Sequence, residues 1–256
     1  MADINKTALT LKALHERANK PLVLANVFDM ISARAVAQLP SSEALATASY
    51  AVAQAAGTTD DDLTLEENLQ AVRGVAAVAK EFNKPLTVDI QDAYGPRLEE
   101  AIGKLLDLGV VGVNLEDYDN EAKILFDVDT AVSRIRRVLD VARKRNVPDF
   151  VVNARCDVLV QGGKLEEVLD RGSKYLEAGA TTVFVWGGSK RGVSTAEVVK
   201  MVKGFDGRLN VSLKDGGLTI PELADIGVAR ISVGPRLQFA AIDAYERAAE
   251  SLLTQL

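Results

Sequence analysis

The chain has 256 residues, of which 48% are hydrophobic and 26% are charged, and its net charge is −6. The length matches the roughly 250 residues of one (β/α)8 barrel, and the composition is that of an ordinary globular protein. A negative net charge disfavours nucleic-acid and membrane-surface partners, and no apolar run is long enough to span a bilayer. Because the single cysteine, Cys156, allows no internal disulfide, we expect a reducing compartment, the cytoplasm.

Short apolar segments alternate with amphipathic segments along the whole chain. The apolar segments are predicted strands, at about residues 21–26, 44–49, 85–90, 110–116, 149–155, 181–186, 208–213 and 230–234. Strands that alternate with helices predict a parallel sheet, and eight such units predict closure. An open doubly wound sheet is disfavoured, because the first strand runs into Asn26-Val-Phe-Asp29 rather than into a glycine-rich loop. We therefore predict one α/β domain over residues 1–256, a (β/α)8 barrel.

A weak internal repeat supports this fold. The order helix, glycine, strand recurs around Gly109, Gly179 and Gly227, where a glycine suits the left-handed residue that ends a helix. The strands after these glycines share apolar positions but end in different residues. A common scaffold with divergent strand ends is expected of a barrel that carries its site at the mouth.

Polar residues are concentrated at the C-terminal ends of the predicted strands, where barrel enzymes carry their sites. These residues are Asn26, Asp29, Ser49, Tyr50, Asp89, Gln91, Asp92, Glu116, Asp117, Asn153, Arg155, Asp157, Lys214 and Asp215, with Asp60, Asp61 and Asp62 in the loop after the second strand. Such a gathering of acids predicts a functional site rather than a purely structural rim.

The acids Asp89 and Glu116 end neighbouring predicted strands. Two unit charges about 4 Å apart repel by roughly 4 kcal/mol at an effective dielectric near 20, so ionising both requires a counter-charge. An all-oxygen set of ligands favours Mg²⁺, with Mn²⁺ as an alternative, and Zn²⁺ is disfavoured because His15 and Cys156 stand apart. The competing interpretation is that these acids cap helices or pair with Arg155.

A guanidinium is predicted in the same mouth, because Arg155 follows the apolar strand around residues 149–154. It is suited to hold a carboxylate or phosphonate by two parallel hydrogen bonds. A salt bridge to Glu116 or Asp157 is the structural alternative, and it is compatible with substrate binding.

Five stretches of the chain resemble the isocitrate lyase/phosphoenolpyruvate mutase superfamily: residues 21–37, 87–95, 112–119, 151–159 and 222–237. The run Asp89-Ile-Gln91-Asp-Ala-Tyr-Gly is similar to the strand-3 signature of that superfamily, Asp-x-(Asp/Glu)-x-Gly-Tyr-Gly. Glu116 with the aspartate that follows it, and Asn153-Ala-Arg155, match its motifs on the next two strands. The order and spacing of these motifs make the likeness specific.

The resemblance implies that Asp89 binds Mg²⁺ directly, with Asp60 and Glu116 acting mostly through bound water. It also implies that the backbone around Ser49 and Tyr50, together with Asn153 and Arg155, holds the substrate. Members of the superfamily use the metal to stabilise the enolate of a small α-oxo or hydroxy carboxylate or phosphonate. The resemblance therefore implies a lyase-type enzyme that makes or breaks a C–C or P–C bond.

Two departures from the superfamily pattern bear on this prediction. Gln91 replaces the second acid of the strand-3 signature, so we expect it to assist the metal through water, with a loss of one charge. The lyase loop Lys-Lys-Cys-Gly-His is replaced by residues 117–127, which contain neither Cys nor His. Tyr118 and Lys123 are the candidate proton carriers left in that loop.

Two other functions are compatible with the sequence. Lys214 closes a predicted strand and could form a Schiff base in a metal-independent barrel. Alternatively, the barrel has lost its chemistry and binds a small oxyanion.

A C-terminal helix at about 237–255 is more apolar than one contact face requires, so we expect it to pack on or swap with a partner in a homo-oligomer, a dimer or a tetramer.

Overall fold

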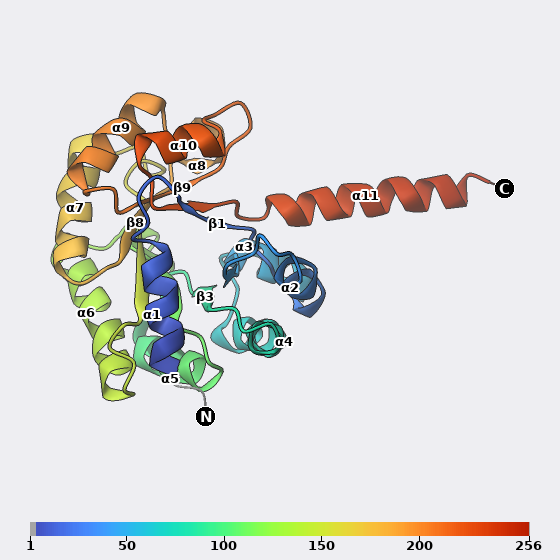
Figure 1. The fold of residues 1–256 in the computed structure, drawn as a ribbon, viewed down its shortest axis with the longest axis horizontal. Helices are drawn as coiled ribbons and strands as arrows, with labels where there is room; N and C mark the ends of the chain where they lie inside the picture. Colours follow the sequence, from blue (N-terminus) through green and yellow to red (C-terminus); the bar gives the residue numbers. More distant parts are fainter. Residues whose placement is uncertain (1–3, 256) are drawn as a thin grey trace.

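The computed structural model describes residues 4–255, and a parallel eight-stranded sheet forms its centre (Figure 1). The strand order is β1-β10-β9-β8-β7-β4-β3-β2, and a parallel bridge between Val27 and Thr47 joins the two edges into a barrel. The strands are β1 (Leu22–Leu24), β2 (Leu45–Ala46), β3 (Leu86–Asp89), β4 (Gly112–Glu116), β7 (Val151–Cys156), β8 (Thr182–Val185), β9 (Leu209–Ser212) and β10 (Arg230–Ser232). Each overlaps a predicted strand, so the predicted barrel is confirmed.

Helices follow the strands and form the outer layer. They are α1 (Ile4–Leu14), α2 (Met30–Ala37), α3 (Ser49–Ala56), α4 (Leu65–Glu81), α5 (Leu98–Asp107), α6 (Val128–Lys144), α7 (Leu165–Glu177), α8 (Gly188–Arg191), α9 (Thr195–Gly204), α10 (Ile220–Ile226) and α11 (Arg236–Leu253), with a 3₁₀ turn at Gly95–Arg97. Capping boxes begin several of them; in α4, for example, Thr64 and Glu67 satisfy each other's backbone N–H groups. After β4 the chain also forms a short hairpin, β5 (Tyr118–Asp119) with β6 (Ile124–Leu125).

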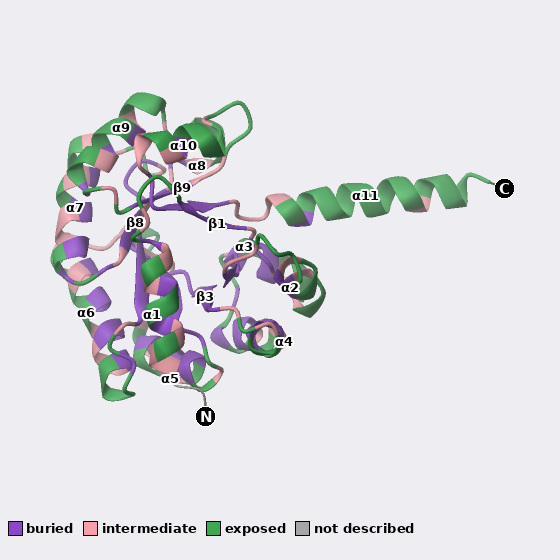
Figure 2. Cartoon of the chain, in the orientation of Figure 1, coloured by how far each residue is buried: buried purple, intermediate pink, exposed green. Residues whose placement is uncertain are grey.

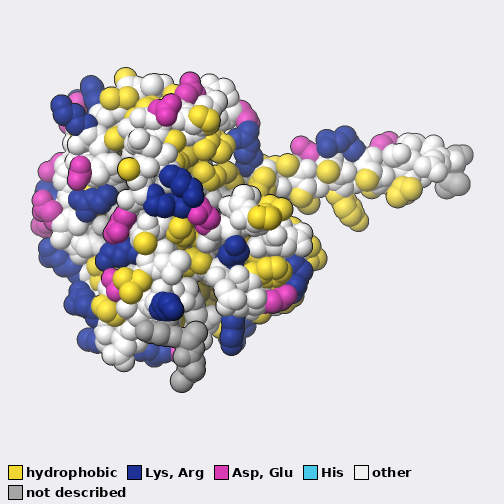
Figure 3. All heavy atoms as spheres, viewed as in Figure 1, with side chains coloured by type: hydrophobic (Ala, Val, Ile, Leu, Met, Phe, Trp, Pro, Cys, Tyr) yellow, Lys and Arg dark blue, Asp and Glu magenta, His cyan; other side chains and the backbone are white. Residues whose placement is uncertain are grey.

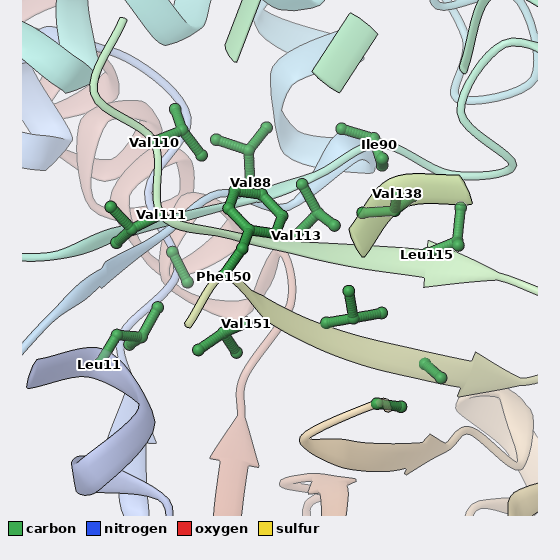
Figure 4. Packing of buried hydrophobic residues seen from close by; sticks show 14 of the residues in the cluster. Leu11, Val88, Ile90, Val110, Val111, Val113, Leu115, Val138, Phe150 and Val151 are labelled. Carbon is green, nitrogen blue, oxygen red and sulfur yellow. The ribbon is translucent and has the colours of Figure 1, made fainter. Parts of the chain in front are cut away.

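The strands place apolar residues on their outer face, against the helices, and polar residues inside the barrel. Val88 and Val113 are fully buried in the apolar layer beneath the helices (Figures 2 and 4). Their neighbours Asp89 and Asn114 point inward, since successive side chains of a strand alternate between faces. The barrel is therefore held by a ring-shaped apolar layer around a polar interior.

Helix α1 lies against the N-terminal ends of the strands. A Cβ on Gly112, the first residue of β4, would meet the Leu11 side chain at 3.0 Å, and Leu11 lies beside Val151 in Figure 4. His15 directly follows α1 and is only 5% exposed, so it is enclosed at this end of the barrel. The N-terminal end of the barrel is thus closed and the C-terminal end is open.

Helix α11 extends away from the barrel (Figures 1 and 2). Of its described residues, Gln238 alone is buried, and large apolar side chains such as Ile242 and Tyr245 are exposed. Figure 3 shows hydrophobic side chains along this helix. Within residues 4–255 no helix is both long enough and apolar enough to cross a lipid bilayer.

Candidate active site

A cavity of about 540 Å³ opens at the C-terminal ends of the strands, and its wall is formed by six of the barrel strands and by the segments that follow β1 and β2. Its volume lies in the range of small-molecule sites. Among the residues that line it are Asn26, Ser49, Asp89, Asn114, Arg155, Trp186, Lys214 and Ser232. The residues brought together by the fold therefore include most of those singled out from the sequence.

The carboxylate of Asp89 is fixed by neutral donors on both oxygens. The backbone N–H of Ser49 donates to Oδ2 at 2.9 Å, and the side-chain amide of Asn114 donates to Oδ1 at 2.8 Å. The backbone N–H of Asp89 in turn donates to Thr47 Oγ1 at 2.9 Å. No positive side chain neutralises this carboxylate within ion-pair distance among the described residues, so its charge is available to a cation in the cavity.

Asp60 lies on the same wall of the cavity. Burial and the nearby Asp89 carboxylate together raise the pKa of Asp60 to about 6, against an opposing hydrogen bond from Ser49. Two acids that disfavour each other's ionisation are the arrangement that a divalent cation relieves. Within residues 4–255, no group of three or more Asp, Glu, His or Cys side chains is arranged to hold a metal ion by itself.

Gln91 faces Asp60 rather than the main cavity. Its amide nitrogen donates to the Asp60 carbonyl oxygen at 2.6 Å and to Asp60 Oδ1 at 3.1 Å. Its backbone is left-handed, with φ of 51°, which turns the side chain toward the loop after α3. Gln91 therefore positions Asp60, and its predicted contact with metal-bound water stays a prediction.

Arg155 is paired with two carboxylates. Nη1 lies 2.6 Å from Glu116 Oε1, and Nε lies 2.8 Å from Asp157 Oδ1. Burial lowers the pKa of Arg155, but the two carboxylates outweigh burial and raise it overall. The guanidinium carbon also lies 4.5 Å from the centre of the Trp186 ring, so the guanidinium presents its remaining edge to the cavity from a fixed plane.

Glu116 does not line the cavity, although it ends β4 beside Asp89 on β3. It is buried behind Arg155, and burial raises its pKa while Arg155 opposes that rise. The predicted pairing of Glu116 with Arg155 is present. The predicted role of Glu116 in holding metal-bound water stays a prediction.

A belt of neutral polar side chains runs around the barrel interior from Asp89. Asn153 donates to Asn114 Oδ1 at 2.8 Å, and Thr182 donates to Asn153 Oδ1 at 2.6 Å. Asn210 and Ser232 continue the belt across the next two strands. Asn153, predicted to bind substrate, is fully buried within this belt and also lines the cavity.

The two candidate proton carriers lie in the β5–β6 hairpin, outside the residues that line the cavity. The ammonium of Lys123 is exposed and lies 2.9 Å from Asp61 Oδ2. Tyr118 is partly buried in the first strand of the hairpin. Their roles stay predictions, and this structure places neither side chain in the lining.

Sequence reasoning missed several residues of the site, Asn114 among them, and two others matter most. Trp186 directly follows β8 and stacks on Arg155; it was visible only as the divergent last position of the repeat. Arg230 begins β10 and reaches the cavity from inside the barrel. The signal for Arg230 was the alternation of Arg230 and Ser232 with apolar residues, which places both side chains on the inner face.

Comparison with known proteins agrees with this geometry. Residues 11–253 match the family model described as phosphoenolpyruvate phosphomutase. An uncharacterised protein of Mycobacterium tuberculosis is 30% identical over 220 residues, which cover 84% of this chain and 78% of that protein. The phosphoenolpyruvate phosphomutase of Streptomyces hygroscopicus is 31% identical over 172 residues, 63% of this chain and 53% of that protein.

Solved structures show the same fold. A protein of Burkholderia cenocepacia J2315 that is provisionally assigned as a phosphonomutase superposes with a TM-score of 0.88 at 32% identity, covering 97% of this chain and 99% of that chain. A 2,3-dimethylmalate lyase superposes with a TM-score of 0.84 at 24% identity, covering 97% of this chain and 88% of that chain. The resemblance found in the motifs thus extends over the whole barrel.

Proposed function

The chain belongs to the phosphoenolpyruvate phosphomutase family, and on that premise we propose that it is a Mg²⁺-dependent enzyme of C–C or P–C bond cleavage or formation. Its relatives include a phosphonopyruvate hydrolase and a 2-methylisocitrate lyase, so the family is one of enzymes that act on small carboxylates or phosphonates. The proposed substrate is a small α-oxo or hydroxy acid that reacts through its enolate. The observation that carries the proposal is the uncompensated pair Asp60 and Asp89 in one cavity with Arg155.

Different residues of the cavity would bind the metal ion and the substrate. Asp89 and Asp60 offer oxygen ligands that suit Mg²⁺ or Mn²⁺, and the bound ion supplies Lewis-acid stabilisation of the developing negative charge. Arg155, held on two sides by carboxylates, orients the substrate carboxylate or phosphonate with its remaining donors. The backbone at the start of α3, at Ser49 and Tyr50, lines the same cavity and is the second contact for that group.

Ligand-induced stabilisation tests the proposal directly. We expect oxalate, pyruvate, oxaloacetate or phosphonopyruvate to raise the melting temperature by several degrees only when Mg²⁺ is present. EDTA should abolish the shift, and so should Asp89→Asn, because it removes the charge while keeping the shape. Trp186, the only tryptophan of the chain, should report the same binding by its fluorescence.

Asp61→Asn is the matched control. Asp61 is next to Asp60 in sequence, but it is exposed, pairs with Lys123 and does not line the cavity. This variant should keep the Mg²⁺-dependent shift. A shift that persists in Asp89→Asn, or one that needs no metal, would overturn the proposed metal site.

Two other functions remain as outcomes of this screen. A barrel without chemistry would bind an oxyanion but convert none of these acids, with or without Mg²⁺. A Schiff-base barrel would trap substrate on Lys214 with borohydride. The surroundings of Lys214 disfavour the latter, because its exposed ammonium donates to the carbonyl oxygens of Lys190 and Arg191, unlike the apolar pocket of a nucleophilic lysine.

We also propose that the protein is a homo-oligomer in the cytoplasm. Helix α11 exposes Phe239, Ile242 and Leu253 along its length, and Val23 on the outer face of β1 is 38% exposed where a barrel strand is normally covered by a helix. A partner's α11 is the proposed cover for this gap. Light scattering should show a dimer or tetramer that Ile242→Glu dissociates, and a monomeric wild-type protein would refute the proposal.

A further inference from the structure

We propose that the floor of the cavity is an anion subsite built on Arg230, separate from the metal-binding wall. Arg230 begins β10 and is 3% exposed, yet it lines the same cavity as Asp89. Its Nε and Nη1 atoms have no hydrogen-bond partner. It also forms no ion pair with any residue in the described part of the chain. This guanidinium is thus a buried, unpaired charge in the wall of the cavity, with Nε and Nη1 enclosed by protein.

The neighbours of Arg230 do not neutralise it. The belt above it consists of amides and hydroxyls that bond to one another, such as Asn210 with Ser232. The Asp89 oxygens already accept from Ser49 and Asn114. An unpaired charge in a protein interior is costly, and buried charges are normally paired. A negatively charged ligand at the floor would therefore stabilise the Arg230 guanidinium.

The titration states support a positive floor at neutral pH. Burial lowers the pKa of Arg230 to about 10, with Asp89 opposing, so the guanidinium stays protonated. Burial also lowers the pKa of His15, which interacts electrostatically with Arg230, to about 3, so the imidazole stays neutral. His15 Nδ1 lies 2.8 Å from the Leu11 carbonyl oxygen and must carry the ring proton, so Nε2 is a free acceptor. The floor thus carries one positive charge.

The ligand that fits this charge is a small oxyanion of carboxylate size, because a guanidinium forms strong, charge-assisted hydrogen bonds with carboxylate oxygens. It has two sources. One is a free anion such as formate or bicarbonate, and the other is a second carboxylate of the substrate. The subsite requires no metal and no catalysis, so it stands or falls independently of the proposed function.

Metal-free protein tests the subsite. With EDTA present and ionic strength held by a bulky sulfonate buffer salt, formate should raise the melting temperature saturably. Arg230→Met, which keeps the approximate volume and removes the charge, should weaken this effect by about tenfold or more. Arg236→Met is the matched control, since Arg236 lines the mouth of the same cavity and is paired with Asp215. It should change formate affinity by less than about twofold.

Crystals of wild-type protein soaked in bromide provide a test that needs no variant. An anomalous peak beside the Arg230 guanidinium would support the subsite. A water bridging Arg230 to His15 Nε2, with bromide only at the mouth or surface, would overturn it. Equal formate binding by Arg230→Met and wild type would also overturn it.

Displacement of the bound bromide by substrate-like acids then shows where the anion comes from. If oxaloacetate displaces bromide from the floor while pyruvate does not, the subsite takes a second carboxylate of the substrate. If neither displaces bromide, the floor holds a free anion. In both cases Asp89→Asn should leave formate binding intact or strengthen it, because the substitution removes the negative charge that interacts with Arg230. Loss of formate binding therefore reports on the subsite and not on the metal site.

Discussion

Each end of the barrel carries an arginine inside the cavity, and the two arginines have different surroundings. At the open C-terminal end, Arg155 is clamped between Glu116 and Asp157. Toward the closed N-terminal end, Arg230 lies near neutral His15 without a partner. Both guanidiniums line one cavity; the Arg155 side chain is 15% exposed and Arg230 is 3% exposed.

This difference shows that burial alone does not decide what a charged residue does. Paired charges at the mouth hold a rigid plane against which a substrate can be oriented. The unpaired charge at the floor attracts an external ion of opposite charge more strongly than a paired charge does. The same holds for the unpaired Asp60 and Asp89 above it. The acids at the wall of the cavity therefore favour a bound cation, and the arginine at its floor favours a bound anion.

The largest expected effect separates the two arginines by the sign of their stability change. Arg155→Met leaves Glu116 and Asp157 buried without a counter-charge, so we expect a loss of about 3–5 kcal/mol in the free energy of unfolding. Arg230→Met removes an unpaired charge and should leave stability unchanged or raise it by about 1 kcal/mol in anion-free buffer. Urea unfolding at pH 7.5 measures both. Equal destabilisation by the two substitutions would mean that Arg230 has a protein partner.

The closed end should also make the fold acid-sensitive. His15 has a pKa of about 3 in the folded protein, against an ordinary value of 6.5 that applies to the unfolded chain. As the pH falls, the unfolded chain therefore binds a proton before the folded protein does. Stability from this residue is complete above pH 6.5 and falls as pH drops toward 3, by about 2 kcal/mol at pH 5. His15→Gln should flatten the pH dependence between pH 7 and 5, measured by urea unfolding. An unchanged slope would show that His15 is not the group responsible, and it is the only histidine.

Much of the scaffold could be predicted because it depends on local rules. The glycines of the repeat have the left-handed backbone expected of them, with φ of 85° at Gly109, 107° at Gly179 and 98° at Gly227. The apolar faces of α5 and α6 are buried as helical spacing predicts. Alternation within strands placed Asp89 and Arg155 in the mouth.

The sequence offered Glu116 and Asp157 as partners of Arg155, and both pairs form. Which residues these pairs remove from the cavity could not be decided from the sequence, because this depends on register between strands and on loop paths. Residue 116 of β4 is paired with residue 155 of β7, and this register brings Glu116 to Arg155 and away from the cavity. The loop after β4 folds as a hairpin in which Lys123 pairs with Asp61, a contact between segments 62 residues apart. Arg230 was overlooked because a lone arginine in an apolar strand gives no sign of whether the fold supplies a partner.

The smallest expected effect concerns the acidic wall. Asp60 has a pKa of about 6 in the folded protein against an ordinary value of 3.8, so the folded state holds more protons between these values and loses stability as pH rises through them. Gln91→Glu replaces a donor to Asp60 by a second carboxylate, and in metal-free protein it should cost about 1 kcal/mol at pH 8 and less at pH 5. Gln91→Leu loses the hydrogen bond without adding charge, so it separates the effect of the lost hydrogen bond from the effect of the added charge.

With Mg²⁺ the Glu variant should gain more stability than wild type does, because the added charge then faces a cation. If Mg²⁺ stabilises both proteins equally, Gln91 lies outside the influence of the metal, and Asp60 and Asp89 alone define the wall.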